Sequence, residues 1–319
     1  MNKKKVPKTK ISYKLSIILL ILALIIGFAG YKLFLQPAWY VEDDLIPLWR
    51  KVIKEANLKN YPIYLAKQTK KIKPGIIITY STKYAEKEPA DWNFSEKFPK
   101  SYNLLLEKGI IGNTSIPLLA DPWLIARKLK TKSLGREDFT GGNKEKILIA
   151  ALKEEKTYQA LLAEAAYFSG TQDINSEEAK NTLQRWEKNI LIQGAKTFNS
   201  NDAWSIFFRE DKERWLFTSL SSVSAQDADK TGLIALDRFP DPYSAKQYLL
   251  PIRILWAHST SNNTGLRKLL EKLSETETQE VLAKHTGLVP ANIKANPANP
   301  PAMQAKRAWL SSTHLFLID

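Results

Sequence analysis

The feature that most constrains this chain is an uncharged apolar run directly after a basic N-terminus. Leu15 to Tyr31 reads LSIILLILALIIGFAGY, and Leu33–Leu35 beyond Lys32 extend the run to 21 residues. A helix of that length is about 31 Å long, close to the ~30 Å hydrocarbon core of a bilayer. Residues 1–14 hold six lysines and no acid, which predicts a cytoplasmic tail followed by a transmembrane anchor at residues 15–35.

A cleaved signal peptide is the alternative, because the small residues Gly27 and Ala29 follow a basic and then an apolar stretch. We favour the uncleaved anchor, since the apolar run continues past both small residues. Either interpretation exports the chain after residue 36, and predicts a single-pass protein of the cell membrane with an extracytoplasmic C-terminal part. Trp39 and Trp49 lie near the membrane exit, where tryptophan often serves as an interface anchor.

Net charge and composition limit the partners and the kinds of site that this chain can have. Of the net charge of +14, the six N-terminal lysines supply +6, and the other +8 is spread over segments of mixed sign. Because this excess of positive charge is spread along the chain, it does not predict a nucleic-acid partner. The chain has no cysteine, which excludes a disulfide framework, a Cys-ligated metal, a thiol nucleophile and a lipid-modified cysteine.

The exported part alternates between strand-like and helix-like segments, which indicates an α/β architecture. Pro122 within the extended segment 116–126 favours an edge or crossover strand, and residues 84–100 are expected to form a loop. Asn175 with Glu178, and Ser274 with Glu277, have the spacing of capping boxes, and Gly287 is expected to end a helix. Strands are predicted at 61–66, 76–79, 116–126, 214–218, 233–236 and 252–257, with helices at 45–57, 141–168, from 175 to 191, at 266–273 and at 277–287.

The segment from Thr231 to Asn292 resembles the C-terminal half of a known family. Gly232–Pro240 is a strand that ends in proline, Ile252–Ala257 is a strand that leads into the polar turn Ser259–Asn262, and Thr286–Asn292 reads TGLVPAN. These elements are similar to those of the extracellular solute-binding proteins of ABC importers, especially the carbohydrate-binding group with the type 2 periplasmic binding fold. Ile116–Trp123 also resembles the family's first crossing between lobes. The family's Gly-Gly before the return strand is replaced here by Leu249-Leu250.

The resemblance implies two α/β lobes around a cleft, with lobe one built from residues 37–116 plus 249–319 and lobe two from 117–248. Two crossings of the chain would form the hinge, and closure would trap a small polar solute, such as a sugar, for the permease subunits of the importer. No cofactor is expected.

Motifs of catalysis are absent from the sequence. His258, His285 and His314 have no metal-binding spacing, and the chain has no GxSxG, GxxxxGK[ST] or GxGxxG motif. Two carboxylates facing each other across a cleft would be needed for glycoside hydrolysis, which sequence alone does not reveal. We therefore expect a binding protein rather than an enzyme, with neither catalytic residues nor a metal site.

Candidate ligand-binding residues follow the predicted strands, because ligands in open α/β sheets bind beyond the carboxyl ends of strands. At the first crossing, where the resembled family places a ligand contact, the resemblance implies that Asp121 accepts hydrogen bonds from solute hydroxyls and that Trp123 stacks or packs beside it. Tyr80, Ser81 and Thr82 follow one strand, and Ser219 and Ser221 another. The other candidates are Arg238, Tyr243 and Tyr248 near the return crossing, and Trp92 in a loop that could cap the cleft.

For each candidate, ordinary loop or hinge packing is the alternative. Two other functions also remain open, namely a surface scaffold or interaction protein that kept the fold without transporting a solute, and a hydrolase of envelope glycans.

Overall fold

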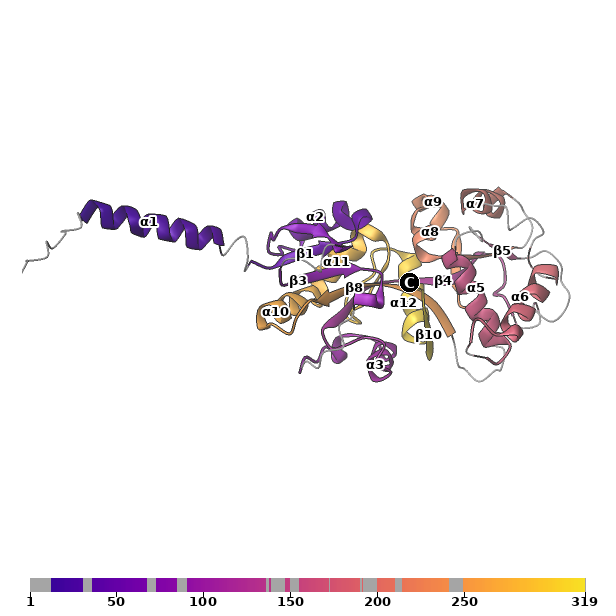
Figure 1. Ribbon diagram of the computed structural model, residues 1–319. Coiled ribbons are helices and arrows are strands. Elements are labelled where there is room, and N and C mark those ends of the chain that lie inside the picture. Colours follow the sequence, from indigo (N-terminus) through magenta and orange to yellow (C-terminus); the bar gives the residue numbers. More distant parts are fainter. Residues whose placement is uncertain are drawn as a thin grey trace, which may run out of the picture.

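The computed structural model describes residues 13–30, 36–67, 73–84, 91–135, 138, 147–149, 155–171, 173–189, 191, 200–209, 214–240 and 249–318. Figure 1 shows the N-terminal helix α1 (Tyr13–Gly30) lying apart from an elongated α/β body. Its large apolar side chains between Ile17 and Ile26 are 41–65% exposed. Within the described part of the chain, no helix combines the length and apolar character needed to cross a membrane.

The first sheet is built around three parallel strands. β1 (Ala38–Val41) lies between β2 (Ile63–Leu65) and β3 (Gly75–Thr79), and β3 pairs antiparallel with β8 (Leu249–Ser259). The helices that the structure describes at this end of the molecule are α2 (Ile46–Glu55), α3 (Lys100–Glu107), α10 (Thr264–Leu273) and α11 (Thr276–Thr286). The leucines of α10 and the Trp49 face of α2 are buried, as expected for amphipathic helices on a sheet.

One long strand connects the two ends of the body. β4 (Ser115–Lys128) pairs with β8 from Ser115 to Pro122, and then pairs with β6 (Trp215–Ser219) from Trp123 onward. The predicted crossover role of this segment is therefore confirmed, although the strand lies at the centre of the sheet. The pairing of Pro122 with Ile252 is the last one between β4 and β8, so the strand changes neighbours at the proline.

The second sheet lies at the other end of β4. β5 (Ile147–Ile149) pairs parallel with β6, and β7 (Ile234–Asp237) pairs antiparallel with β4. Its helices are α5 (Glu155–Phe168), α6 (Glu177–Asn189), α7 (Ser200–Arg209), α8 (Leu220–Ser224) and α9 (Ala228–Thr231). A separate apolar core fills this end, formed by β5, β6, α5 and α6 around Trp186, Trp215 and Phe217.

The C-terminal segment ties the two ends together. After β9 (Val289–Pro290), α12 (Pro300–Leu310) packs against both β7 and α8, and β10 (His314–Leu317) pairs with the start of β8. The larger core cluster consequently includes Trp204 and Leu220 from the second end together with Trp39 and Trp256 from the first.

Several local predictions were wrong. Trp39 and Trp49 are not interface anchors, because both are fully buried and their rings meet edge to face at 5.3 Å. The stretch read as one helix up to Phe168 contains strand β5, whose residues 147–149 are all buried. The stretch 84–100 includes a 3-10 turn, Ser95–Lys97, and the first residue of α3.

Both predicted capping boxes were also wrong. Ser176, rather than Asn175, accepts the N-terminal hydrogen bond of α6, from the backbone of Ala179. α11 begins after Glu275, and the Ser274 hydroxyl instead donates to the carbonyl of Glu271. The predicted end of α11 is confirmed, because Gly287 is left-handed with φ +68°.

Candidate functional site

Charged and aromatic side chains gather where β4 and β8 cross between the two sheets. Asp121 and Arg253 are direct partners in the antiparallel pairing of these strands, so their side chains share one face. The guanidinium carbon of Arg253 lies 3.6 Å from the centre of the Tyr80 ring, a close cation–π contact. Tyr80 follows β3 directly, at the carboxyl end of the first parallel sheet. We call the group of Tyr80, Asp121, Lys156, Ser221 and Arg253 the crossing cluster.

Asp121 is held from the second sheet. Its Oδ1 accepts a hydrogen bond of 2.8 Å from the backbone N–H of Ser221, and the Ser221 hydroxyl lies 2.9 Å from that of Ser219. The side chain is buried, and burial raises the pKa of the carboxyl above its ordinary value. The hydrogen bonds of Ser221 and the positive charges of Arg253 and Lys156 counter that effect.

The positive charges of the cluster are also perturbed. Burial lowers the pKa of Lys156, in the first turn of α5, and the nearby guanidinium of Arg253 lowers it further. Burial and the negative charge of Asp121 raise the pKa of the Tyr80 phenol to about 12. The Nε atom of Arg253 is buried and has no hydrogen-bond partner among the described residues. A buried donor without a partner costs about 1–3 kcal/mol.

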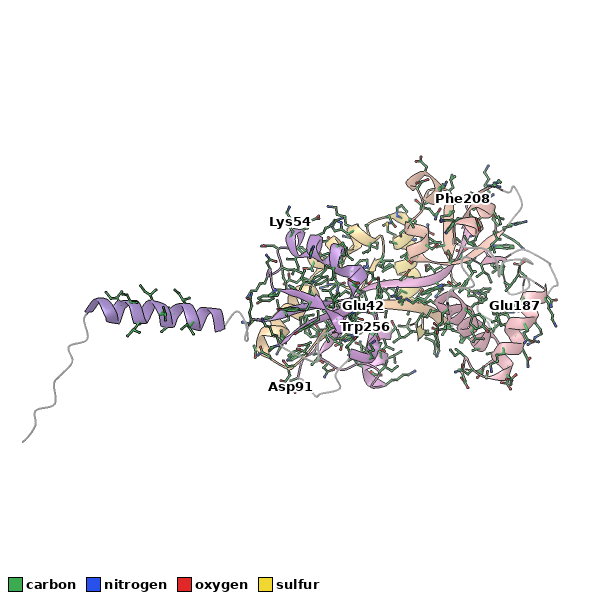
Figure 2. The ribbon with its side chains drawn as sticks, turned by 45° about the horizontal axis from the view of Figure 1, so that its top comes forward. Glu42, Lys54, Asp91, Glu187, Phe208 and Trp256 are labelled. Carbon is green, nitrogen blue, oxygen red and sulfur yellow. The ribbon has the colours of Figure 1, made fainter. Side chains whose placement is uncertain are left out.

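Glu42 adds a negative charge at the edge of the cluster. Its carboxylate accepts hydrogen bonds from the Thr79 hydroxyl and, at 3.2 Å, from the backbone N–H of Tyr80. It follows β1 as Tyr80 follows β3, so the carboxyl ends of two neighbouring parallel strands meet here. Figure 2 shows Glu42 near the middle of the body, between Lys54 towards one end and Glu187 towards the other.

His258 on β8 holds the segment that presents Tyr80. Its Nε2 lies 3.2 Å from the carbonyl oxygen of Ser81, which can only accept, so Nε2 carries the proton. Its Nδ1, 2.7 Å from the Ser115 hydroxyl, must then accept. The ring is fully buried, and burial lowers the pKa of His258 to about 4, so it is neutral near pH 7.

The structure brings four of the predicted site residues together, namely Tyr80, Asp121, Ser219 and Ser221. Ser81 and Thr82 continue from Tyr80, and the carbonyl of Ser81 is the acceptor for His258. Trp123 is 4% exposed and packs in the second core beside Ile125, so it packs rather than stacks on a solute.

Other candidates lie elsewhere. Trp92 is 7% exposed and belongs to the first core, so it does not cap a cleft. Arg238 donates to Ser311 beyond α12, away from the crossing cluster. Tyr243 and Tyr248 lie outside the described residues. His258 is a core residue that positions a loop. The described residues contain no group of three side chains that could hold a metal ion.

Sequence reasoning missed Arg253, Lys156 and Glu42. A signal existed for Arg253, because it is the one charged residue within the apolar strand LLPIRILWA. A charge in such a strand needs a specific partner, which makes the position worth attention.

Comparison with known proteins bears on the overall fold of the chain. No family model and no curated protein matches the chain. Among solved structures, it is similar to a probable secreted solute-binding lipoprotein from Streptomyces coelicolor, with a TM-score of 0.63, 11% identity and 88% of each chain covered. RafE from Streptococcus pneumoniae has a TM-score of 0.62 at 11% identity, over 90% of this chain and 88% of RafE. The Bordetella ferric binding protein has a TM-score of 0.59 at 17% identity, over 86% of this chain and 95% of its own.

These likenesses establish the fold, which is the mixed α/β fold of the two-lobed solute-binding proteins, as the resemblance in the sequence implied.

Proposed function

We propose that this chain is a membrane-tethered, extracytoplasmic solute-binding protein that captures a carbohydrate or similar polar solute for an ABC importer. The observation that carries the proposal is the crossing cluster, in which Arg253 lies beside Asp121 and Tyr80 and its buried Nε has no partner among the described residues. Donors, an acceptor and an aromatic ring within one group are the chemistry that recognises hydroxyl-bearing solutes.

The cluster draws its residues from both proposed lobes. Tyr80 and Arg253 come from residues 37–116 and 249–319, whereas Lys156 and Ser221 come from residues 117–248. A solute held between these groups would favour the closed arrangement of the lobes, because it would contact both at once. The solved structures of similar fold are described as solute-binding or ferric binding proteins, which also supports a binding role without catalysis.

Tethering is supported by the N-terminal sequence and by α1. The large apolar side chains of α1 between Ile17 and Ile26 are exposed, and the apolar segment follows the basic residues 1–14. Its 18 described residues correspond to about 27 Å, a few ångströms less than the hydrocarbon core. An anchor of residues 15–35 would place the α/β body outside the cell membrane.

A scaffold that kept the fold is the second candidate, and a specific observation favours it. Arg253 already covers one face of the Tyr80 ring at 3.6 Å, and Ser221 already occupies Asp121. If these internal contacts are permanent, the crossing cluster holds the two lobes together and does not bind a solute.

A thermal-shift screen of the full-length protein in detergent, with monosaccharides, oligosaccharides and other polar solutes, tests the proposal. A solute at a hundredfold excess over its Kd should add about 2.7 kcal/mol of stability. Arg253→Gln should abolish that shift, whereas Arg267→Gln on α10, whose partner is the exposed Glu271, should leave it unchanged. If no solute shifts the melting temperature, the scaffold is favoured instead.

A further inference from the structure

A cavity of about 300 Å³ lies between α3 of the first end and α5 of the second. Figure 1 shows β10, which also lines it, between these two helices on the lower side of the body. The cavity shares no residue with the crossing cluster. On α5, Ala163 in its lining is two turns of helix from Lys156, or about 10 Å. On β8, Leu249 is four positions from Arg253, or about 13 Å.

Most of the described lining is apolar, with nine aliphatic or phenylalanine side chains among fifteen residues. Leu104 and Ile110 on one side are 40% and 39% exposed, so apolar surface is open to the cavity. Ile174 and Phe316 line the cavity as well, and both pack against the second core. Covering such surface with a hydrocarbon group removes it from water, which is favourable.

The cavity has a positive charge and no negative one among its described lining residues. Lys108 is the only lysine, arginine, aspartate or glutamate in that lining. Its side chain is exposed and forms no ion pair or side-chain hydrogen bond with a described residue. Glu107 and Glu164 are sequence neighbours of lining residues but do not line the cavity. An unpaired ammonium therefore lies beside an apolar wall, without a lining carboxylate to repel an anion.

The end of α3 presents Lys108 and Ile110 together. Gly109 between them is left-handed, with φ +64°, which ends the helix. The N–H groups of Gly109 and Ile110 donate to the carbonyls of Leu106 and Leu105, at 2.9 and 3.0 Å. These bonds satisfy carbonyls at the helix end, whose partial negative charge would otherwise oppose an anion.

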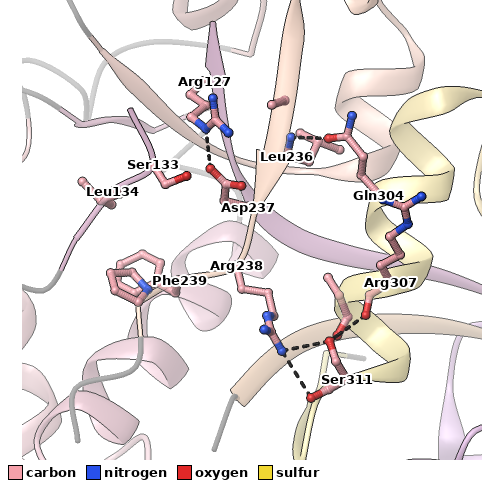
Figure 3. Close-up of a pocket in the computed structure, with 13 residues that line it drawn as sticks. Arg127, Ser133, Leu134, Leu236, Asp237, Arg238, Phe239, Gln304, Arg307 and Ser311 are labelled. Atoms are coloured by element: carbon pink, nitrogen blue, oxygen red, sulfur yellow. Dashed lines mark hydrogen bonds and ion pairs between the residues drawn. The ribbon is translucent and has the colours of Figure 1, made fainter. Parts of the chain in front are cut away.

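The wall formed by β10 is held on both sides. His314 to Leu317 pair with the start of β8. Before them, Arg238 donates to the carbonyl of Ser311 at 3.2 Å and to its hydroxyl at 3.0 Å, as Figure 3 shows. The chain that lines the cavity is thus fixed at either end, and a preformed site reduces the entropy lost on binding.

We propose that this cavity binds a small carboxylate with an apolar body, such as an arylalkanoate. The body would lie against Leu104, Ile110 and Phe316, and the carboxylate would accept charge-assisted hydrogen bonds from the ammonium of Lys108. The volume is at the lower end of the range for small-molecule sites, about 300–1,000 Å³, so a single ring or a short chain fits.

The proposal goes beyond solute capture and does not depend on it, because the cavity and the crossing cluster have no residue in common. The ligand would contact α3, from residues 37–116, and α5, from residues 117–248, at once. It would favour the present arrangement of these helices, since helices that move apart cannot both contact it.

Protection of an introduced cysteine tests the site, because the chain has no cysteine of its own. Thr171→Cys places a thiol in the cavity lining at a half-exposed position. Thr276→Cys on α11, also half-exposed but outside the lining, is the matched control. The full-length protein in detergent is alkylated with iodoacetamide in the presence and absence of 3-phenylpropanoate. At a tenfold excess over its Kd, the ligand should slow alkylation of Thr171→Cys about tenfold and leave Thr276→Cys unaffected.

Further variants, made together with Thr171→Cys, separate the charge from the apolar wall. Lys108→Gln should raise the Kd of 3-phenylpropanoate about two- to fivefold, the range for an exposed ion pair, and leave that of uncharged 3-phenylpropanol unchanged. Lys268→Gln, at an exposed lysine of α10 outside the lining, should change neither. Leu104→Gln should weaken both ligands to the same extent. All three positions are exposed, and an unchanged melting temperature without ligand checks that the variants fold.

Protection of Thr171→Cys by 3-phenylpropanoate that Lys108→Gln weakens supports the site. Equal protection by 3-phenylpropanol, or protection that is insensitive to Lys108→Gln, overturns the assignment to a carboxylate. Equal slowing at Thr276→Cys, or no protection of Thr171→Cys by either 3-phenylpropanoate or hexanoate, overturns the site.

Discussion

His258 should make the stability of this protein depend on pH, and the structure supplies both the sign and the size of the effect. Its pKa falls from an ordinary value of 6.5 to about 4 on burial. Between these values the unfolded chain binds a proton at this residue and the folded chain does not. Stability is therefore complete above pH 6.5 and is lost as the pH falls towards 4.

The magnitude follows from the difference in pKa. One unit of pKa corresponds to 1.36 kcal/mol, so the whole transition should remove about 3 kcal/mol, of which about 2 kcal/mol is gone at pH 5. Because His258 Nε2 donates to the Ser81 carbonyl, protonation would also disturb the segment that carries Tyr80. Acid should thus loosen the crossing cluster before the whole domain unfolds.

Urea denaturation at pH 7.5 and pH 5 measures the effect, with His258→Asn as the variant that cannot titrate in this range. The variant should be less stable at pH 7.5, since the Ser115 and Ser81 contacts are disturbed, but should lose about 2 kcal/mol less on acidification. Ser115→Ala is the control, because it removes the bond to Nδ1 and keeps the imidazole. Equal acid sensitivity in wild type and His258→Asn would refute the reasoning.

Two further predictions concern stability alone. Gly287→Ala should destabilise by about 1–3 kcal/mol more than Gly109→Ala in urea denaturation. Both glycines have positive φ, but a Cβ at Gly287 would lie 2.6 Å from the Ser224 hydroxyl, whereas Gly109 has open space; equal losses would contradict this. Burial raises the pKa of the Glu164 carboxyl well above 4.5. The folded state therefore binds this proton more tightly than the unfolded chain, and the stability gained in this way at low pH is lost as the pH rises through the raised pKa. Glu164→Gln should therefore gain stability relative to wild type as the pH rises above 4.5, and a constant difference in urea midpoint would argue against it.

Local sequence signals predicted much of the fold. The apolar runs at 76–79, 214–218, 233–236 and 252–257 correspond to β3, β6, β7 and β8, within a few residues at each end. The proline in β4 indicated a crossover, and Gly287 indicated a helix end. These signals succeed because a strand or a helix end depends on residues close together in the chain.

The candidate site was only half predictable. Tyr80 and the serines at and after the end of β6 could be named because the carboxyl ends of strands converge at one edge of a sheet. Asp121 could be named because residues 116–123 resemble the family's first crossing between lobes. Arg253 could not be assigned to Asp121, because their pairing depends on the register of two strands that lie more than a hundred residues apart. For the same reason Arg238, expected at the cleft, is found beside Ser311 at the end of α12.

By itself, then, the sequence determined that this chain carries an apolar N-terminal segment, lacks cysteine chemistry and alternates strands with helices. Only the tertiary structure decided which side chains meet, and whether an aromatic residue faces a solute, a membrane or the core. Trp39, Trp49, Trp92 and Trp123 are all buried in cores, although each was compatible with another role. The physical reason is that an amphipathic ring suits any apolar environment, and its environment is chosen by the packing of distant segments.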